Sequence, residues 1–109
     1  AKLCHIKKNG TAVQLCDGLK RVSVRKSLEE VTPATPGETF EIDINLWATG
    51  IKVFPGEAIR LEISSSALPK FAPHLNTLEH QGTATKAVIS TQTIFHDPKH
   101  LSYLELETI

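Results

Sequence analysis

The sequence predicts an all-β fold, a sandwich of about eight antiparallel strands, and three observations support it. Apolar and polar residues alternate along Ala58–Ser64 with the period of two that a half-buried strand requires. Phe40–Leu46 alternates in the same way, and the turn-forming pair Pro55-Gly56 lies between the two segments. No stretch carries the apolar period of a convincing helix. We therefore expect two long strands that are antiparallel neighbours.

The N-terminal part of the chain predicts three shorter strands. Lys2–Ile6 and Thr11–Cys16 are strand-like runs joined by Asn9-Gly10, a pair that favours a tight type I′ hairpin turn. Asp17-Gly18 predicts a further turn. Leu19–Arg25 then alternates, which predicts a third strand with its valines inward and its arginines outward.

The remainder of the chain predicts loops and further strands. The segment Lys26–Glu38 contains two prolines and a glycine, so we expect a loop there and not a helix. Ser64–Thr85 is a long irregular segment, which we expect to cross over one end of the sandwich. The strands expected in this part of the chain are Thr39–Leu46, Ala58–Ser64, Thr85–Phe95 and Ser102–Leu106.

Composition narrows the class of protein. The 109 residues correspond to one domain, and 12 Lys and Arg balance 12 Asp and Glu. Without a basic patch or stripe, we expect no nucleic-acid partner. The apolar runs are far shorter than the roughly 20 residues of a membrane span, so we expect no membrane partner. No signal-peptide pattern opens the chain, which favours a cytoplasmic protein over a secreted one.

The two cysteines, Cys4 and Cys16, fall in the first predicted hairpin. They could face each other and form a disulfide. Two free, buried thiols are the favoured interpretation, because cysteine is among the residues most often buried and one pair in a non-secreted chain is weak evidence for a disulfide.

Trp47 is the only tryptophan and stands at the end of a predicted strand. It could serve as a platform on which a sugar stacks, since jelly rolls are common among carbohydrate-binding modules. The favoured interpretation is a packing anchor whose N–H finds a nearby partner. It is a candidate ligand or interface residue.

His96, Asp97 and His100 form the other candidate cluster. Asp97 and two imidazoles could contribute to a metal site, but Pro98 prevents a helix that would place both rings on one face. The favoured interpretation is a turn that Asp97 caps by accepting hydrogen bonds from local backbone N–H groups. We predict no catalytic residue, no cofactor and no bound metal.

Several motifs in a fixed order resemble one known family. They are Asp43-Ile44-Asn45-Leu46-Trp47, Val53-Phe54-Pro55-Gly56, Ile59-Arg60-Leu61, Ile63-Ser64-Ser65-Ser66 and Thr93-Ile94-Phe95-His96-Asp97-Pro98-Lys99-His100. Together they resemble the C-terminal β domain of the serine-hydrolase family that includes cocaine esterase, glutaryl acylases and X-prolyl dipeptidyl aminopeptidases. The resemblance implies a jelly roll, here without the family's first strands.

The resemblance also implies a non-catalytic role. Relatives act through a Ser–His–Asp triad on a separate α/β-hydrolase domain, and this chain has no Gly-x-Ser-x-x-Gly elbow to hold the nucleophile. We therefore expect an accessory domain that stabilises such a catalytic domain and walls part of its pocket in an ester or amide hydrolase. The expected partner is that catalytic domain or a second copy of the chain. The alternative is a stand-alone module that binds carbohydrate or protein.

Overall fold

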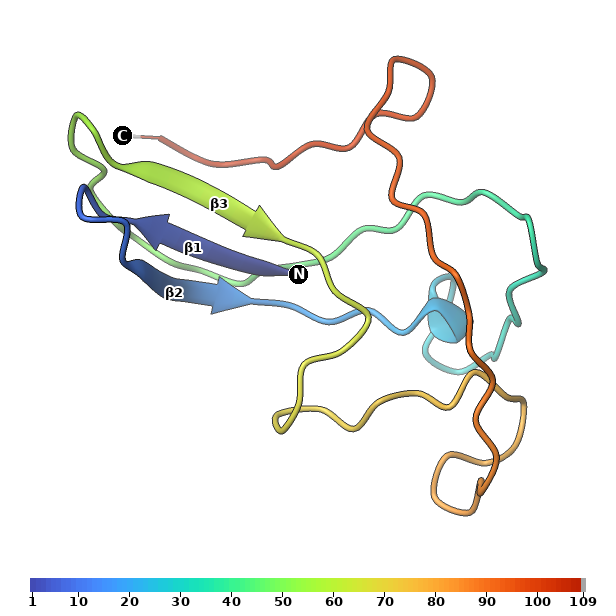
Figure 1. Cartoon of the computed structure of the whole chain (residues 1–109). Helices are drawn as coiled ribbons and strands as arrows, with labels where there is room; N and C mark the ends of the chain where they lie inside the picture. Colours follow the sequence, from blue (N-terminus) through green and yellow to red (C-terminus); the bar gives the residue numbers. More distant parts are fainter. Residues whose placement is uncertain (109) are drawn as a thin grey trace. The chain divides into compact units, whose positions relative to one another are not determined.

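The structure, a computed structural model, describes residues 1–108. The chain divides into two compact units, Ala1–Ser65 and Ser66–Ile109. The first unit holds the strands β1 (Lys2–Ile6), β2 (Ala12–Asp17) and β3 (Ala58–Glu62) and one short 3-10 helix, η1 (Val22–Val24) (Figure 1). Among the described residues, no helix has the length and apolar character needed to cross a membrane. Because three strands and this three-residue helix are the regular elements of the described residues, the fold is all-β, as the alternation predicts.

The three strands form one open antiparallel sheet in the order β2-β1-β3 (Figure 1). β1 pairs with β2 from Lys2 opposite Asp17 to Ile6 opposite Ala12, and with β3 from Lys2 opposite Glu62 to Ile6 opposite Ala58. The central strand therefore has a hydrogen-bonding neighbour on each side.

Burial follows from this central position. Leu3, Cys4 and His5 of β1 are only 2%, 3% and 7% exposed.

The pairing of β1 with β2 is irregular, because the register shifts between Leu3 and Cys4. As a result Cys16 lies opposite Leu3, while Cys4 lies opposite Gln14. Both cysteines are free thiols, Cys4 buried and Cys16 half-buried.

The hairpin between β1 and β2 is confirmed, but the type I′ turn is wrong. A type I′ turn needs positive φ at both central residues, whereas here Gly10 has φ +82° and Asn9 does not lie in the left-handed region. Gly10 N donates to Lys7 O (2.8 Å) and Lys7 N donates to Thr11 O (2.9 Å). This is the pattern of a longer loop that a left-handed glycine closes.

The turn before β3 is the one that Pro55-Gly56 predicts. Glu57 N donates to Phe54 O (3.0 Å), and Gly56 has φ +86°. Proline before a left-handed glycine is the sequence of a type II turn. This turn delivers the chain into β3, the part of the predicted strand Ala58–Ser64 that pairs with β1.

The predicted strand Leu19–Arg25 is wrong, since the chain bends there into η1. Arg25 points inward rather than outward, and its side chain is only 6% exposed. Its guanidinium donates to the carbonyls of Val22 (3.1 Å) and Thr32 (2.7 Å) and reaches Glu38 Oε1 (3.4 Å). A buried guanidinium must find such partners, and these bonds hold the loop in place of a strand ladder.

The other predicted strands differ as well. Within the described residues, no strand is formed at 39–46, 85–95 or 102–106. Alternation predicts which faces a strand presents, but a strand exists only where a neighbour completes its ladder of backbone hydrogen bonds. The second unit is held instead by isolated bonds, such as Val88 N to Leu75 O (2.9 Å).

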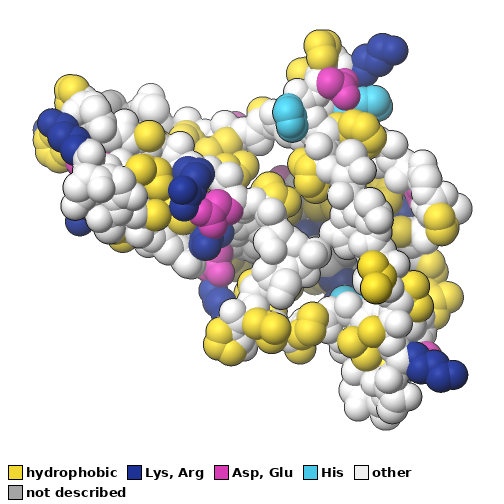
Figure 2. Space-filling view, viewed as in Figure 1, with side chains coloured by type: hydrophobic (Ala, Val, Ile, Leu, Met, Phe, Trp, Pro, Cys, Tyr) yellow, Lys and Arg dark blue, Asp and Glu magenta, His cyan; other side chains and the backbone are white. Residues whose placement is uncertain are grey.

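Large apolar side chains remain exposed in both units, and Figure 2 shows hydrophobic side chains (yellow) in several patches on the visible face. In the second unit Ile89 is 98% exposed and Leu78 is 82% exposed. Contiguous apolar patches on the surface of a soluble protein often mark an interaction site.

Candidate functional site

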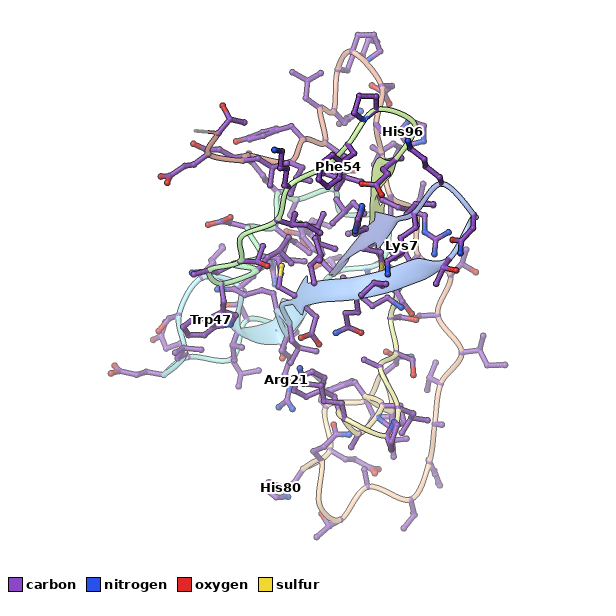
Figure 3. All side chains as sticks on the ribbon, turned by 90° about the vertical axis from the view of Figure 1, so that its left-hand side faces the viewer. Lys7, Arg21, Trp47, Phe54, His80 and His96 are labelled. Carbon is purple, nitrogen blue, oxygen red and sulfur yellow. The ribbon has the colours of Figure 1, made fainter. Side chains whose placement is uncertain are left out.

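Trp47 stands in a strained, exposed position in the first unit (Figure 3). Its φ is +65°, a left-handed conformation that a bulky residue rarely adopts. The side chain of Asn45 holds this conformation, because Trp47 N donates to Asn45 Oδ1 (2.7 Å). Trp47 is 79% exposed, so the interpretation as a packing anchor is wrong within the part of the chain that the structure describes.

The segment that carries Trp47 is positioned by a close backbone approach. A Cβ on Gly18 would lie 2.1 Å from Asn45 O, so only glycine leaves room there for the Asn45 carbonyl. Gly18 is itself tied to the start of the sheet, since Gly18 N donates to Ala1 O (2.9 Å). The exposed tryptophan therefore projects from a segment anchored beside the end of β2.

The second candidate cluster forms a capped turn in the second unit. Asp97 Oδ1 accepts hydrogen bonds from Lys99 N (2.8 Å) and His100 N (3.0 Å), and His100 Nδ1 lies 3.2 Å from the same oxygen. The bond from Lys99 N is the largest of the contributions that lower the pKa of Asp97. The ring of His100 also lies against Phe95, with 4.7 Å between centroids. The predicted capped turn is confirmed.

His96 is exposed beside this turn, where Figure 3 labels it. Within residues 1–108, no group of three His, Cys, Asp or Glu side chains is arranged to hold a metal ion. Because Trp47 and the turn belong to different units, each is a candidate contact by itself.

Two polar clusters of the first unit are absent from the sequence-based candidates. One is the network of Arg25 described above, in which Glu38 Oε2 also accepts from Thr35 N (3.1 Å). The bond from Thr35 N contributes most to lowering the pKa of Glu38, ahead of the charge of Arg25. The other joins His5 of β1 to Glu57, with 2.9 Å between Nε2 and Oε2. Alternation along β1 leaves the partner of His5 undefined, because that partner is 52 residues away in the sequence.

Charged side chains also meet across the pair of strands β1 and β3. Lys2 Nζ lies 2.6 Å from Glu62 Oε2, and Arg60 Nη2 lies 2.5 Å from Glu62 Oε1. The hydrogen bond from Lys2 is the main reason that the pKa of Glu62 is lowered. These exposed contacts bring two cations to one carboxylate and form no recognisable catalytic constellation.

Comparisons with known proteins identify the family. The chain is 33% identical over 117 residues to the cocaine esterase of Rhodococcus sp. (strain MB1 Bresler), an alignment that covers 100% of this chain. It spans only 19% of the length of that relative. No solved structure matches significantly. The family described as the X-Pro dipeptidyl-peptidase C-terminal non-catalytic domain matches residues 1–105. The chain therefore belongs to the family of X-Pro dipeptidyl-peptidase C-terminal non-catalytic domains.

Proposed function

We propose that this chain is the non-catalytic C-terminal accessory domain of a larger serine hydrolase. The observation that carries the proposal is the match to a family of such domains over residues 1–105. The relative of which the chain spans 19% is an esterase by name, which supports ester or amide hydrolysis in the longer protein. The role of the domain is to stabilise an α/β-hydrolase catalytic domain and to wall part of its pocket.

The same proposal includes the complete fold. The sheet β2-β1-β3 is one part of a jelly-roll sandwich of about eight strands. The alternating segments 39–46, 85–95 and 102–106 supply further strands once neighbouring chain completes their ladders. The exposure of Ile89 in the segment 85–95 supports this, because sandwich strands bury one face.

Trp47 and the turn that contains His96, Asp97 and His100 are the proposed contacts with the catalytic domain. Trp47 supports this role best, since a large aromatic ring on a fixed backbone loses little conformational freedom when it is buried. Covering a ring of this size contributes on the order of 2 kcal/mol to the contact.

The first test is to read the coding sequence upstream of the codon for Ala1. We expect the open frame to continue into a Gly-x-Ser-x-x-Gly elbow. The protein encoded by the whole frame should then react with a fluorophosphonate, whereas residues 1–109 alone should not. A start codon directly before Ala1, or labelling of the isolated chain, would refute the proposal.

A second test addresses Trp47 in that longer protein. Trp47→Ala should lower the temperature at which the hydrolase inactivates, because the contact between domains is weakened. The matched control is Leu28→Ala, since Leu28 is 85% exposed in the same unit and is not part of the proposed contact. Equal effects of the two variants would remove Trp47 from the interface. Specific quenching of Trp47 by a glycan in the isolated chain would instead favour a carbohydrate-binding module.

A further inference from the structure

A histidine and a carboxylate meet at the central strand of the sheet. His5 lies on the central strand β1 and is 7% exposed. Its Nε2 lies 2.9 Å from Glu57 Oε2, and the two side chains are 9% and 14% exposed. Glu57 stands directly before β3, so the pair joins β1 to the start of the strand beside it.

The same oxygen of Glu57 that contacts His5 also accepts a hydrogen bond from the backbone of the preceding turn. Phe54 N donates to Glu57 Oε2 (2.9 Å), and Glu57 N donates to Phe54 O (3.0 Å). The side chain therefore closes the Phe54–Glu57 turn and ties it to β1 at the same time. The bond from Phe54 N, followed by that from His5, lowers the pKa of Glu57, so the carboxylate stays ionised in mildly acidic solution.

The strand positions on either side of His5 carry no charge. The residues opposite His5 are Val13 on β2 and Ile59 on β3, and both are uncharged. Lys8 lies beside the turn, with its Cε 3.4 Å from the position of a Cβ on Gly56, and its charge also favours ionised Glu57. Farther along the sheet, Asp17 and Glu62 lie opposite Lys2, and Arg60 and Cys16 lie opposite Cys4 and Leu3. The ion pair that the structure shows for His5 is with Glu57.

Protonation of His5 would place a positive charge in a buried site. A histidine titrates near pH 6.5 in the absence of perturbation, and its charged form is costly in a buried site without a counter-charge. At this site a protonated His5 would form an ion pair with Glu57, whose carboxylate already lies beside the ring. A neutral partner at position 57 would leave the imidazolium without compensation at the centre of the sheet.

We propose that Glu57 is a built-in counter-charge that lets the sheet keep its structure when His5 is protonated. The His5–Glu57 pair is a latch that holds the Phe54–Glu57 turn, and through it β3, against β1. It does so whether His5 is neutral or protonated. The inference concerns the stability of the first unit and does not depend on the proposed function.

The test compares variants of the full chain across the pH range in which histidine titrates. In Glu57→Gln the amide oxygen still accepts hydrogen bonds, but the negative charge is gone. We expect the folding equilibrium constant of this variant to fall by about tenfold or more relative to wild type between pH 8 and pH 5.5. The double variant H5Q/E57Q should lose this dependence, because nothing at the site takes up the proton.

The chain provides its own control for the removal of a carboxylate beside a histidine. His100 and Asp97 form a similar pair, at 3.2 Å, whose side chains are 44% and 46% exposed. Asp97→Asn should therefore leave the pH dependence between pH 8 and pH 5.5 at the wild-type value. Parallel pH profiles for wild type and E57Q, or the same loss in the double variant, would overturn the proposal.

If E57Q does not fold at any pH, wild type still provides a test. Nuclear magnetic resonance follows the His5 ring signals and the exchange of the β1 amides in one titration. The latch requires the amides of β1 to stay protected while the ring titrates. Loss of their protection in step with the His5 titration would overturn it.

Discussion

Gly18→Ala should destabilise the first unit more than Gly50→Ala or Gly10→Ala. The new Cβ would lie 2.1 Å from Asn45 O, 2.9 Å from Asn45 C and 3.0 Å from Ile44 Cγ2. Two of these atoms are backbone, so no side-chain rotation relieves the contact. An ordinary carbon–oxygen contact needs more than 1 Å of additional separation, with packed carbons resting at roughly 3.5–4.0 Å.

The expected cost is about 3 kcal/mol, at the upper end of what overpacking usually costs. The segment at Asn45 must move away from Gly18, or Gly18 must give up its bond to Ala1 O. A loss of this size is a large fraction of the roughly 5–15 kcal/mol that stabilises an ordinary domain. Urea unfolding followed by circular dichroism measures the free energy of unfolding directly.

Two other glycines separate steric from conformational effects. Gly50 has no atom within 4 Å of its would-be Cβ and no positive φ, so Gly50→Ala should leave stability unchanged or raise it by about 0.5 kcal/mol. Gly10 also has open space but a φ of +82°, so Gly10→Ala should cost roughly 1–2 kcal/mol for the left-handed conformation alone. If Gly18→Ala proves as stable as Gly50→Ala, the close approach of Gly18 and Asn45 is refuted.

Two further predictions concern polar groups of the first unit. Arg25→Met should destabilise the unit by about 2 kcal/mol and speed amide exchange between η1 and Thr32, because two carbonyls lose their buried donor; unchanged exchange there would contradict the role of Arg25. Stability should also fall in acid. The pKa values of Glu38 and Glu62 are lowered from 4.5 by hydrogen bonds in the folded state, so their contribution is fully present above pH 4.5 and is lost as the pH falls through the folded pKa values. Unfolding free energies measured from pH 6 to pH 3 check this, and a flat profile would contradict it.

Of the two candidate contacts, only the turn at Asp97 could be predicted from residues close in the sequence. The turn at Asp97 could be predicted because its donors, Lys99 N and His100 N, lie two and three residues away. The exposure of Trp47 could not be predicted in the same way. It depends on whether distant segments cover the ring, and an isolated tryptophan at a strand end is compatible with either outcome.

Some elements of the fold could be predicted from neighbouring residues, and others could not. Alternation and turn chemistry locate β1, β2 and β3, because each is a property of neighbouring residues. The same alternation predicts a strand at Leu19–Arg25, where the structure has η1. A buried guanidinium with carbonyl partners outweighs strand propensity there, and those partners are set by the path of the loop.

The all-β class, the hairpin of β1 and β2, the turn at Pro55-Gly56 and the family could all be predicted from the order of the amino acids. The position of β1 between β2 and β3, and the contact of His5 with Glu57, became known only from the folded chain. The two groups of features differ in the range of the interactions that produce them. Turns and alternation depend on residues a few positions apart, whereas strand order and the pairing of buried charges depend on which distant segments pack together.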